Sequence, residues 1–343
     1  MSPPLAIPLF VLSFAATIVA AEFCAKRLDE LGVRMGIPEA LLGFLTALAS
    51  DAPELTSAVV ALIKGNRDVS IGVVLGSNVF NLAAMIGLSA VLVGSVRLRR
   101  EVALVEAVVA VAVVVFSGTI VLHVLRPAIG AAAILAVLVP YLLLLARGPA
   151  AFRRLPSTGR FGRRLAAELD EAYRPRRRAD HGQPFEPGVE ASRGGTWRPA
   201  LLIVPGIAVI IAGATSMVDI GLSLGHRWQL PDLVIGVFVL AILTSLPDTY
   251  MAIRLAYARR GLAVVSATWH SNTINLLGGV VLPALVIAVA PLTGIVTFDF
   301  AWLLAMTVVA LVLLVRPGGV RRAHGAILIA LYVAFVVVQG IWG

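Results

Sequence analysis

Acidic residues inside apolar stretches are the feature of this sequence that could do chemistry. Asp51 and Glu54 lie in one apolar stretch, three positions apart and so on one helix face, and Asp248 lies in another stretch of the second half. A carboxylate near the middle of a bilayer costs on the order of 3 kcal/mol and needs a cation or a proton to compensate its charge. The basic residue nearest to them in these stretches is Arg254, at least one turn beyond Asp248. We therefore predict a cation site rather than a structural ion pair.

An internal repeat surrounds these acids. It comprises two paired segments, 47–54 with 241–248 and 76–81 with 270–275. One offset relates all of them without a gap (248 − 54 = 275 − 81 = 194). Pro53 and Pro247 occupy the same place in both copies. Because proline lacks an N–H group and clashes with the carbonyl four residues earlier, each copy predicts an interrupted helix.

The second segment of each copy supplies neutral oxygen atoms. Its serine and asparagine side chains are three or four residues apart, so they share a helix face. Oxygen ligands of mixed charge suit hard cations such as Ca2+ and Na+. The sequence has one cysteine and no cluster of histidines, so zinc and copper sites are not expected. The side chains concerned are Ser77, Asn78 and Asn81 in the first copy and Ser271, Asn272 and Asn275 in the second.

The elements that hold these residues belong in a lipid bilayer. The 343 residues are 59% hydrophobic and 14% charged, against about 25% charged residues in soluble domains. Apolar runs of about 18 or more residues can each cross a membrane, and the sequence contains about ten of them. The predicted spans are 5–23, 37–63, 69–95, 101–124, 127–147, 199–222, 231–258, 262–290, 297–315 and 322–342. We expect an all-α polytopic membrane protein with about ten transmembrane helices in two inverted five-helix repeats.

Lysine and arginine gather at alternate connections between the spans, which marks those connections as cytoplasmic. The pattern predicts a multi-pass protein with both termini outside and the basic stretch 148–198 in the cytoplasm. Region 1–147 is then one membrane repeat and region 199–343 a second, crossing in the opposite direction. This orientation accounts for the net charge of +9, so nucleic acid is not an expected partner. Residues 161–173 could form an amphipathic surface helix, although a solvated linker is the simpler interpretation.

The paired motifs resemble the α-repeats of the cation/Ca2+ exchanger superfamily, which includes sodium/calcium, potassium-dependent sodium/calcium and cation/proton exchangers. The likeness covers about 45 residues in each half, together with the ten-helix layout and the central loop. It implies a secondary active antiporter, not an enzyme, that exchanges Ca2+ for Na+ across the cell membrane by alternating access and needs no cofactor. The alternative is a Ca2+/H+ or Na+/H+ antiporter that uses the same site.

The resemblance also implies roles for individual residues. Glu54 and Asp248 would bridge the bound Ca2+, helped by backbone oxygens of Ser50 and Thr244. Sodium sites would add backbone oxygens of Ala47 and Ala241 and the hydroxyls of Ser77, Ser245 and Ser271. The asparagines Asn81 and Asn275, with Asn78 and Asn272 beside them, would lie in the same central group.

Several positions depart from the family pattern. Asp51 replaces a serine found in many members, and Asn275 occupies a position that is acidic in several of them. We expect Asp51 to act as a ligand or a proton carrier. His270 stands where the first copy has Gly76, and its imidazole could couple transport to protons or simply pack in a helix interface. Whether sodium or the proton is the counter-ion therefore stays open.

Two other classes of protein fit the sequence less well than a transporter does. A channel is disfavoured because the sequence shows no repeated selectivity loop. An intramembrane hydrolase would need two carboxyl groups but not the matched serines and asparagines. Ten helices can enclose a site alone, so we expect a functional monomer. Four further acids near span ends are expected at the level of the lipid headgroups: Glu22, Glu101, Glu106 and Asp219.

Overall fold

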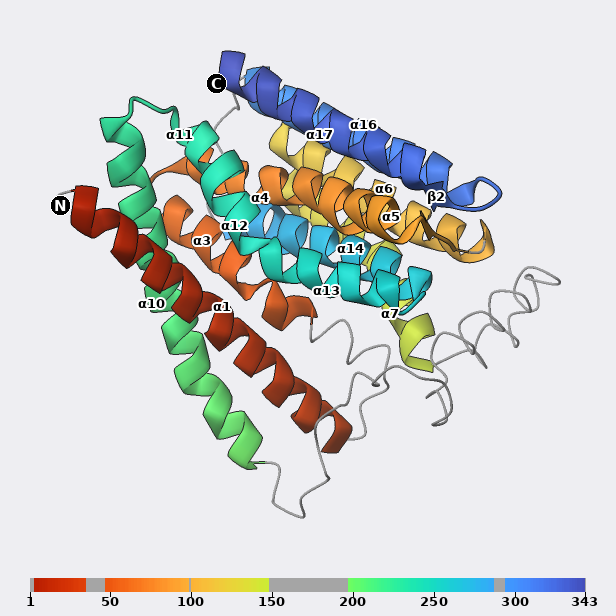
Figure 1. Cartoon of the computed structure of the whole chain (residues 1–343), viewed down its shortest axis with the longest axis horizontal. Helices are drawn as coiled ribbons and strands as arrows, with labels where there is room; N and C mark the ends of the chain where they lie inside the picture. The colour runs from red at the N-terminus through yellow and green to blue at the C-terminus, as the bar shows by residue number, and fades with distance from the viewer. Residues whose placement is uncertain (1–2, 35–46, 99, 148–196, 287–293, 343) are drawn as a thin grey trace.

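The structure is a computed structural model that describes residues 3–34, 47–98, 100–147, 197–286 and 294–342 (Figure 1). The first half contains α1 (Pro3–Arg34), a helical turn at 47–50, α3 (Ala52–Ile63), α4 (Arg67–Asn81), the π-helix η1 (Leu82–Leu88), α5 (Ser89–Val93), α6 (Arg100–Val121) and α7 (Pro127–Arg147). The second half contains α10 (Trp197–Arg227), α11 (Asp232–Val234), η2 (Ile235–Leu240), α12 (Ala241–Thr244), α13 (Leu246–Tyr257), α14 (Gly261–Leu276), η3 (Leu277–Val281), α15 (Leu282–Val286), α16 (Gly294–Val315) and α17 (Arg322–Trp342).

These elements form ten helical segments in the described part of the chain, one for each predicted span. Six of the described helices are long and apolar enough to cross a membrane, and a seventh span results if the bent pair Asp232–Thr244 and Leu246–Tyr257 is counted as one. The prediction of an all-α polytopic membrane protein is confirmed. Helices α1 and α10 continue beyond the ends predicted at residues 23 and 222, because their polar last turns keep helical geometry outside the apolar span.

The centre of the bundle is formed by α4 and α14, which carry the serine and asparagine motifs. In the span Arg67–Val93, 94% of an 18-residue apolar segment is buried inside the protein. The corresponding share is 33% in α1 and in α10. Two glycines allow the α4 backbone to approach α11 and η2 closely. A Cβ on Gly72 would meet the Leu233 carbonyl oxygen at 2.7 Å and Gly236 Cα at 3.2 Å. A Cβ on Gly76 would meet Val237 Cα at 2.8 Å. The motif-bearing helices are therefore the core of the molecule.

Helices α1 and α10 pack against each other along their length at one side of this core (Figure 1). Small side chains let them approach, as a Cβ on Gly206 would meet Cys24 Sγ at 2.4 Å and one on Gly213 would meet Thr17 Oγ1 at 2.0 Å. Ser13 donates a hydrogen bond to Ser216 across the pair at 2.9 Å. Their other faces expose leucine, valine and isoleucine side chains, as expected for surfaces that meet lipid.

A two-stranded ribbon, which the sequence did not predict, joins two of the connections. Strand β1 (Ser95–Val96) pairs antiparallel with β2 (Val320–Arg321), with Ser95 opposite Arg321. The basic connection before α14 contacts this ribbon as well, because a Cβ on Gly261 would lie 2.2 Å from the Arg97 carbonyl oxygen. Three arginine-bearing connections thus lie at one end of the bundle, as the charge pattern predicts.

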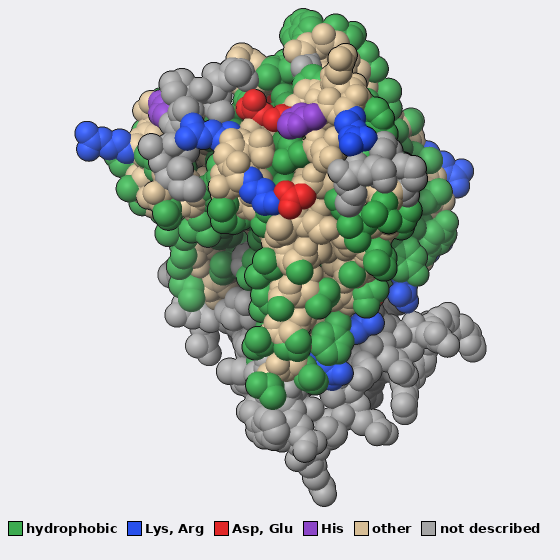
Figure 2. Space-filling view, turned by 90° about the vertical axis from the view of Figure 1, so that its left-hand side faces the viewer, with side chains coloured by type: hydrophobic (Ala, Val, Ile, Leu, Met, Phe, Trp, Pro, Cys, Tyr) green, Lys and Arg blue, Asp and Glu red, His purple; other side chains and the backbone are tan. Residues whose placement is uncertain are grey.

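The face in Figure 2 carries charged and histidine side chains in its upper part, with hydrophobic side chains over its flanks. Lys64, just after α3, pairs with Asp219 on α10, and His226 in the last turn of α10 lies within hydrogen-bond distance of Asp232. Most of the stretch 148–198, including the amphipathic helix considered at 161–173, lies outside the described residues.

Candidate cation site

Two helices break beside the acidic residues, at matching positions of the two repeats. The helices break at Asp51, with φ −78° and ψ −3°, and at Ser245, with φ −85° and ψ −2°, where ψ departs from the helical value of about −42°. Pro53 and Pro247 then lie in the first turn of α3 and α13. The second break bends the helix axis by 45°. The predicted interruptions are confirmed, and each falls two residues before its proline.

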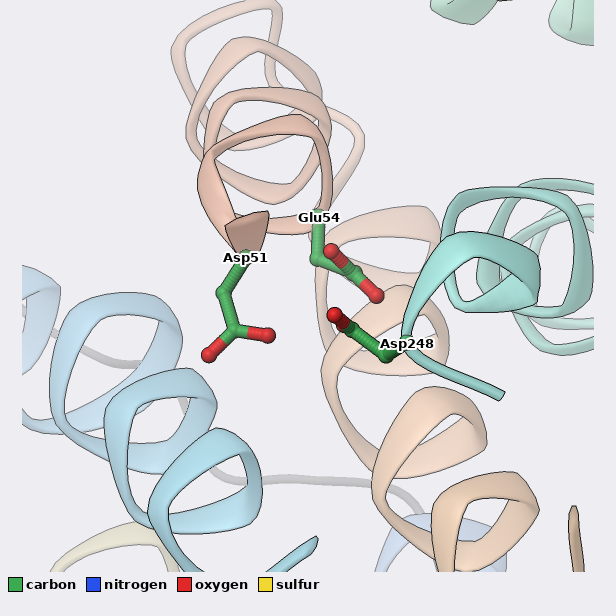
Figure 3. A group of neighbouring side chains, drawn as sticks. All are labelled: Asp51, Glu54 and Asp248. Atoms are coloured by element: carbon green, nitrogen blue, oxygen red, sulfur yellow. The ribbon is translucent and has the colours of Figure 1, made fainter. Parts of the chain in front are cut away.

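Three carboxylates meet at these breaks (Figure 3). Asp51, Glu54 and Asp248 each offer an oxygen atom, and these atoms lie within 4.8 Å of one another. The side chains are 0%, 1% and 8% exposed, respectively. Glu54 and Asp248 stand in the first turns of α3 and α13, where the positive end of the helix dipole favours negative charge. Glu54 and Asp248, which are 194 positions apart in the sequence, therefore form one buried cluster with Asp51.

Serine hydroxyls from the second repeat bind carboxylates of the first. Ser245 Oγ donates to Glu54 Oε1 at 2.9 Å, and Ser271 Oγ donates to Asp51 Oδ1 at 2.8 Å. Each hydrogen bond stabilises a negative charge and aims the carboxylate. The site is thus shared between the repeats and does not belong to either one.

The asparagines make symmetric contacts between α4 and α14. Asn78 Nδ2 donates to the Asn272 carbonyl oxygen at 3.3 Å, and Asn272 Nδ2 donates to the Asn78 carbonyl oxygen at 3.1 Å. Asn81 Nδ2 donates to Ser271 Oγ at 3.0 Å, and the equivalent Asn275 Nδ2 donates to Ser77 Oγ at 3.5 Å. These reciprocal bonds are the contacts that a local two-fold axis between two inverted repeats would produce.

The polar atoms that lack a hydrogen-bond partner around the cluster are mostly oxygens that can only accept from a donor or bind a cation. Buried acceptor groups are seldom left without partners, because the desolvation cost is high. Carboxylate and amide oxygens are the ligands of hard cations. The six atoms are Asp51 Oδ2, Glu54 Oε2, Asp248 Oδ2, Asn78 Oδ1, Asn81 Oδ1 and Asn275 Oδ1.

The remaining predicted residues lie on the broken turns. Ser50 Oγ donates to the Ala47 carbonyl oxygen at 3.1 Å, and Thr244 Oγ1 donates to the Leu240 carbonyl oxygen at 2.8 Å. The Ala47 and Ala241 carbonyl oxygens accept the N–H groups of Asp51 and Ser245 at 2.8 and 3.2 Å. Ser77 Oγ donates to the Val73 carbonyl oxygen at 2.7 Å. The Ser77 and Thr244 hydroxyls bond to their own helices, whereas the Ser50 hydroxyl also lies within hydrogen-bond reach of Asp248.

One expectation about the acids is wrong. Glu106 is 5% exposed and accepts a hydrogen bond from Ser266 Oγ on α14, so it does not face the headgroups. Sequence reasoning assigned it to a span end, although it lies six residues inside α6, and an ionisable residue at that depth is itself a signal of function. Asp299, for which the sequence analysis made no prediction, is also buried, and the Gln339 amide donates to it. Glu22 and Asp219 are 60% and 55% exposed.

The fold and the site together define a class of protein. A polytopic helical protein with inverted repeats, whose interrupted helices bring buried carboxylates together, is a membrane transporter of cations. Both halves of the chain, residues 5–147 and 198–341, match the family described as sodium/calcium exchanger protein. The chain belongs to this family.

Individual relatives agree with this assignment. The putative antiporter CaxA of Alkalimonas amylolytica is 24% identical over 342 residues, which cover 95% of this chain and 96% of the relative. The inner membrane protein YrbG of Escherichia coli is 26% identical over 291 residues, 82% of this chain and 80% of the relative. The sodium/calcium exchanger MaX1 of Methanosarcina acetivorans is 27% identical over 154 residues, 43% of each chain.

Solved structures share the fold. The sodium-calcium exchanger NCX_Mj superposes with a TM-score of 0.59 at 17% identity, covering 97% of this chain and 98% of that one. The structure of native YfkE superposes with a TM-score of 0.64 at 14% identity, covering 97% of this chain and 92% of that one. At these identities the likeness establishes the arrangement of helices alone. The transported ions have to be inferred from the chemistry of the site.

Proposed function

We propose that this chain is a secondary active antiporter that exchanges Ca2+ for Na+ across the membrane by alternating access at one midplane site. The observation that carries the proposal is the cluster of three buried carboxylates with six acceptor oxygens that lack donors, three on the carboxylates themselves and three on the neighbouring asparagine amides. An all-oxygen site with excess negative charge fits a hard cation such as Ca2+ or Na+. The names of relatives such as the exchanger MaX1 support the same two ions.

We assign the ligands by their charge and position. Glu54 and Asp248 bind Ca2+ from opposite repeats, and Asp51 adds a third carboxylate to the same space. The amide oxygens of Asn78, Asn81 and Asn275 complete the oxygen set, with Asn272 in support. Backbone oxygens of Ser50 and Thr244 help to bind Ca2+. The sodium ions add backbone oxygens of Ala47 and Ala241 and the hydroxyls of Ser77, Ser245 and Ser271. Transport needs no cofactor beyond these groups.

Exchange follows from charge compensation. Three ionised carboxylates within 4.8 Å repel one another strongly, so a site without cations resists enclosure by apolar helices. Bound cations remove this penalty and allow closure on one side and opening on the other. The α1–α10 pair, which packs on the side of the central helices, is the element that moves around the fixed core.

Exchange of a cation for H+ at the same site is the second candidate. It is favoured by the presence of Asp51, because protons can neutralise three clustered acids as well as cations can. His270 lies next to Ser271 and is the group that sequence analysis linked to protons. Both candidates use the same residues and differ in the gradient that drives uptake.

We also propose the orientation in the cell membrane. The three arginine-bearing connections at the end marked by β1 and β2 face the cytoplasm, together with the stretch 148–198, and both termini lie outside. Region 1–147 is then the first membrane repeat and region 199–343 the second. A monomer contains the complete site, so we propose that it works as a monomer.

The test is 45Ca2+ uptake into proteoliposomes of the purified protein under an outward gradient of Na+ or of H+. Wild type is compared with Glu54→Gln and Asp248→Asn, and Asp299→Asn serves as a matched control because it neutralises a buried acid outside the site. Sodium-driven uptake that both site variants abolish and the control retains supports the Ca2+/Na+ exchanger. Uptake driven by protons alone assigns the chain to the second candidate, and no gradient-dependent uptake rules out Ca2+ as the substrate.

A further inference from the structure

Glu106 is a buried carboxylate that the proposed exchange does not use. It lies on α6, and its Oε1 atom accepts hydrogen bonds from two other helices. Tyr141 on α7 donates its hydroxyl at 3.0 Å, and Ser266 on α14 donates its hydroxyl at 2.7 Å. Retaining a carboxylate at 5% exposure within a membrane span is costly, so its contacts call for an explanation.

Tyr141 extends these contacts to His270. Its hydroxyl oxygen lies 3.0 Å from His270 Nε2, and the two rings meet edge to face with centroids 6.0 Å apart. A tyrosine hydroxyl has one hydrogen to give. When that hydrogen goes to Glu106, the oxygen accepts a hydrogen from Nε2–H of His270. The carboxylate therefore sets the direction of both hydrogen bonds and the orientation of the imidazole.

Helix α14 is held at two points by this network. Ser266 and His270 are four residues apart and so lie on one face of the helix. Ser271 follows His270 on the adjoining face, where its hydroxyl donates to Asp51 and accepts from Asn81 Nδ2 at 3.0 Å. The face of α14 held by Glu106 thus lies next to the face that enters the cation site.

The first repeat fixes its equivalent helix differently. Gly76 stands at the position of His270, and the absence of a side chain lets α4 pack directly on the η2 backbone. In the second repeat this position carries an imidazole that contacts α7. Close backbone packing therefore fixes the helix of the first repeat, whereas a polar network fixes the equivalent helix of the second repeat.

We propose that Glu106 is a positioning residue for the cation site. Through Ser266, Tyr141 and His270 it fixes the rotation of α14 about its axis and so holds the Ser271 hydroxyl against Asp51. The inference rests on the proposed function, since it requires a cation to bind among Asp51, Glu54 and Asp248. Sites that bind ions lose affinity when a ligand-bearing element is displaced by a fraction of an ångström.

Two substitutions of Glu106 separate the hydrogen bonds from the bulk of the side chain. Glu106→Gln keeps an oxygen that accepts from Tyr141 and Ser266, whereas Glu106→Leu keeps similar volume and accepts nothing. We expect the leucine variant to bind Ca2+ or Na+ about two- to tenfold more weakly, as for the loss of one or two hydrogen bonds, and the glutamine variant to stay close to wild type. Isothermal titration of the purified, folded proteins with CaCl2 and with NaCl measures the affinities.

Matched controls exist for the two donors. Tyr141→Phe and Ser266→Ala remove hydroxyls that bind Glu106. Tyr332→Phe and Ser117→Ala remove buried hydroxyls that have no hydrogen-bond partner. The inference expects weaker cation binding in the first pair alone, and in uptake assays a raised KM with an unchanged maximal rate.

The outcomes distinguish this inference from the proposed function. Wild-type protein that binds neither cation overturns the proposed function and the inference with it. Wild-type protein that binds a cation, with folded Glu106→Leu, Tyr141→Phe and Ser266→Ala variants of unchanged affinity, overturns the inference alone. Equal losses in Glu106→Gln and Glu106→Leu also overturn it, because glutamine retains the accepting oxygen. If Glu106→Leu does not fold, the two hydroxyl variants and their controls decide.

Discussion

At the scale of single residues, the acids are distributed unevenly between the two repeats. Asp51 and Glu54 come from the first and Asp248 from the second, while the hydroxyls that bind Asp51 and Glu54 come from the second. The position equivalent to Asp51 is Ser245, so one repeat supplies an additional charge and the other a hydrogen-bond donor. Asp51 is therefore the residue that makes the two repeats unequal in charge at this site.

The charge of Asp51 is tested by Asp51→Asn. The amide oxygen can still accept from Ser271, so the variant removes a negative charge and keeps the hydrogen bond. Two unit charges about 4 Å apart near a protein surface interact by about 4 kcal/mol, and about 1.4 kcal/mol already corresponds to tenfold in affinity. We expect the Ca2+ Kd to rise at least about tenfold in isothermal titration. A Kd equal to that of wild type would show that Asp51 does not bind the ion, and Asp299→Asn is the control.

The sequence predicted these three acids because two signals coincide on them. Each lies in an apolar stretch, and each belongs to a repeat whose copies must meet if the protein is inverted about its centre. Glu106 has the first signal but not the second. Its partner Ser266 is 160 positions away, and only the packing of α6 on α14 shows that they meet. Its position inside a span therefore signals function, but its partners could not be predicted from the sequence.

At the scale of secondary structure, the site depends on how closely α4 approaches η2 and α12. A Cβ on Gly76 would lie 3.0 Å from Ala241 Cβ, at the start of the turn that carries Thr244. The added methyl group has backbone on one side and a short side chain on the other, so neither can move without shifting the helix.

We therefore expect Gly76→Ala to destabilise the fold by about 1–3 kcal/mol and to lower the melting temperature in detergent. Cation affinity should fall as well, because α12 leads into the break at Ser245. The matched control is Gly340→Ala, where a Cβ meets nothing within 4 Å and alanine favours the helix. Equal melting temperatures for Gly76→Ala and wild type would contradict the account of this interface.

Two kinds of element escaped prediction. Each motif helix continues into a π-helix, η1 directly after Asn81 and η3 two residues after Asn275. Such segments are frequent at functional sites, but the apolar sequence of a membrane helix carries no period that signals them. The strands β1 and β2 have two residues each, which is too short for an alternating pattern. The number of helices and the positions of the breaks could be predicted, because both follow from local features of the sequence, namely the length of each apolar run and the presence of a proline.

At the scale of the whole molecule, the charge pattern and the fold agree on which connections share a membrane side. The ribbon β1–β2 and the contact of Gly261 with Arg97 bring three arginine-bearing connections together. The connection before α7, which carries Arg126, follows one crossing by α6 and so lies at the other end. Orientation in the membrane is then decided by a single measurement at each end.

The orientation is tested by thiol labelling. Replacing Cys24, the sole cysteine, by alanine gives a background in which a single cysteine is introduced at the exposed positions Arg126 or Arg321. In intact cells a membrane-impermeant maleimide should label Arg126→Cys and leave Arg321→Cys unlabelled until the cells are opened. The reverse pattern would place both termini in the cytoplasm and contradict the proposed topology.

The central claim is that one cation binds between the two repeats at the carboxylate cluster. Anomalous X-ray diffraction from crystals of the wild-type protein grown in CaCl2 tests it most directly. We predict an anomalous peak within about 2.3–2.6 Å of oxygens from both Glu54 and Asp248. The peak should be displaced when crystals are transferred to NaCl. A Ca2+ peak elsewhere, with none between these two side chains, would contradict the account.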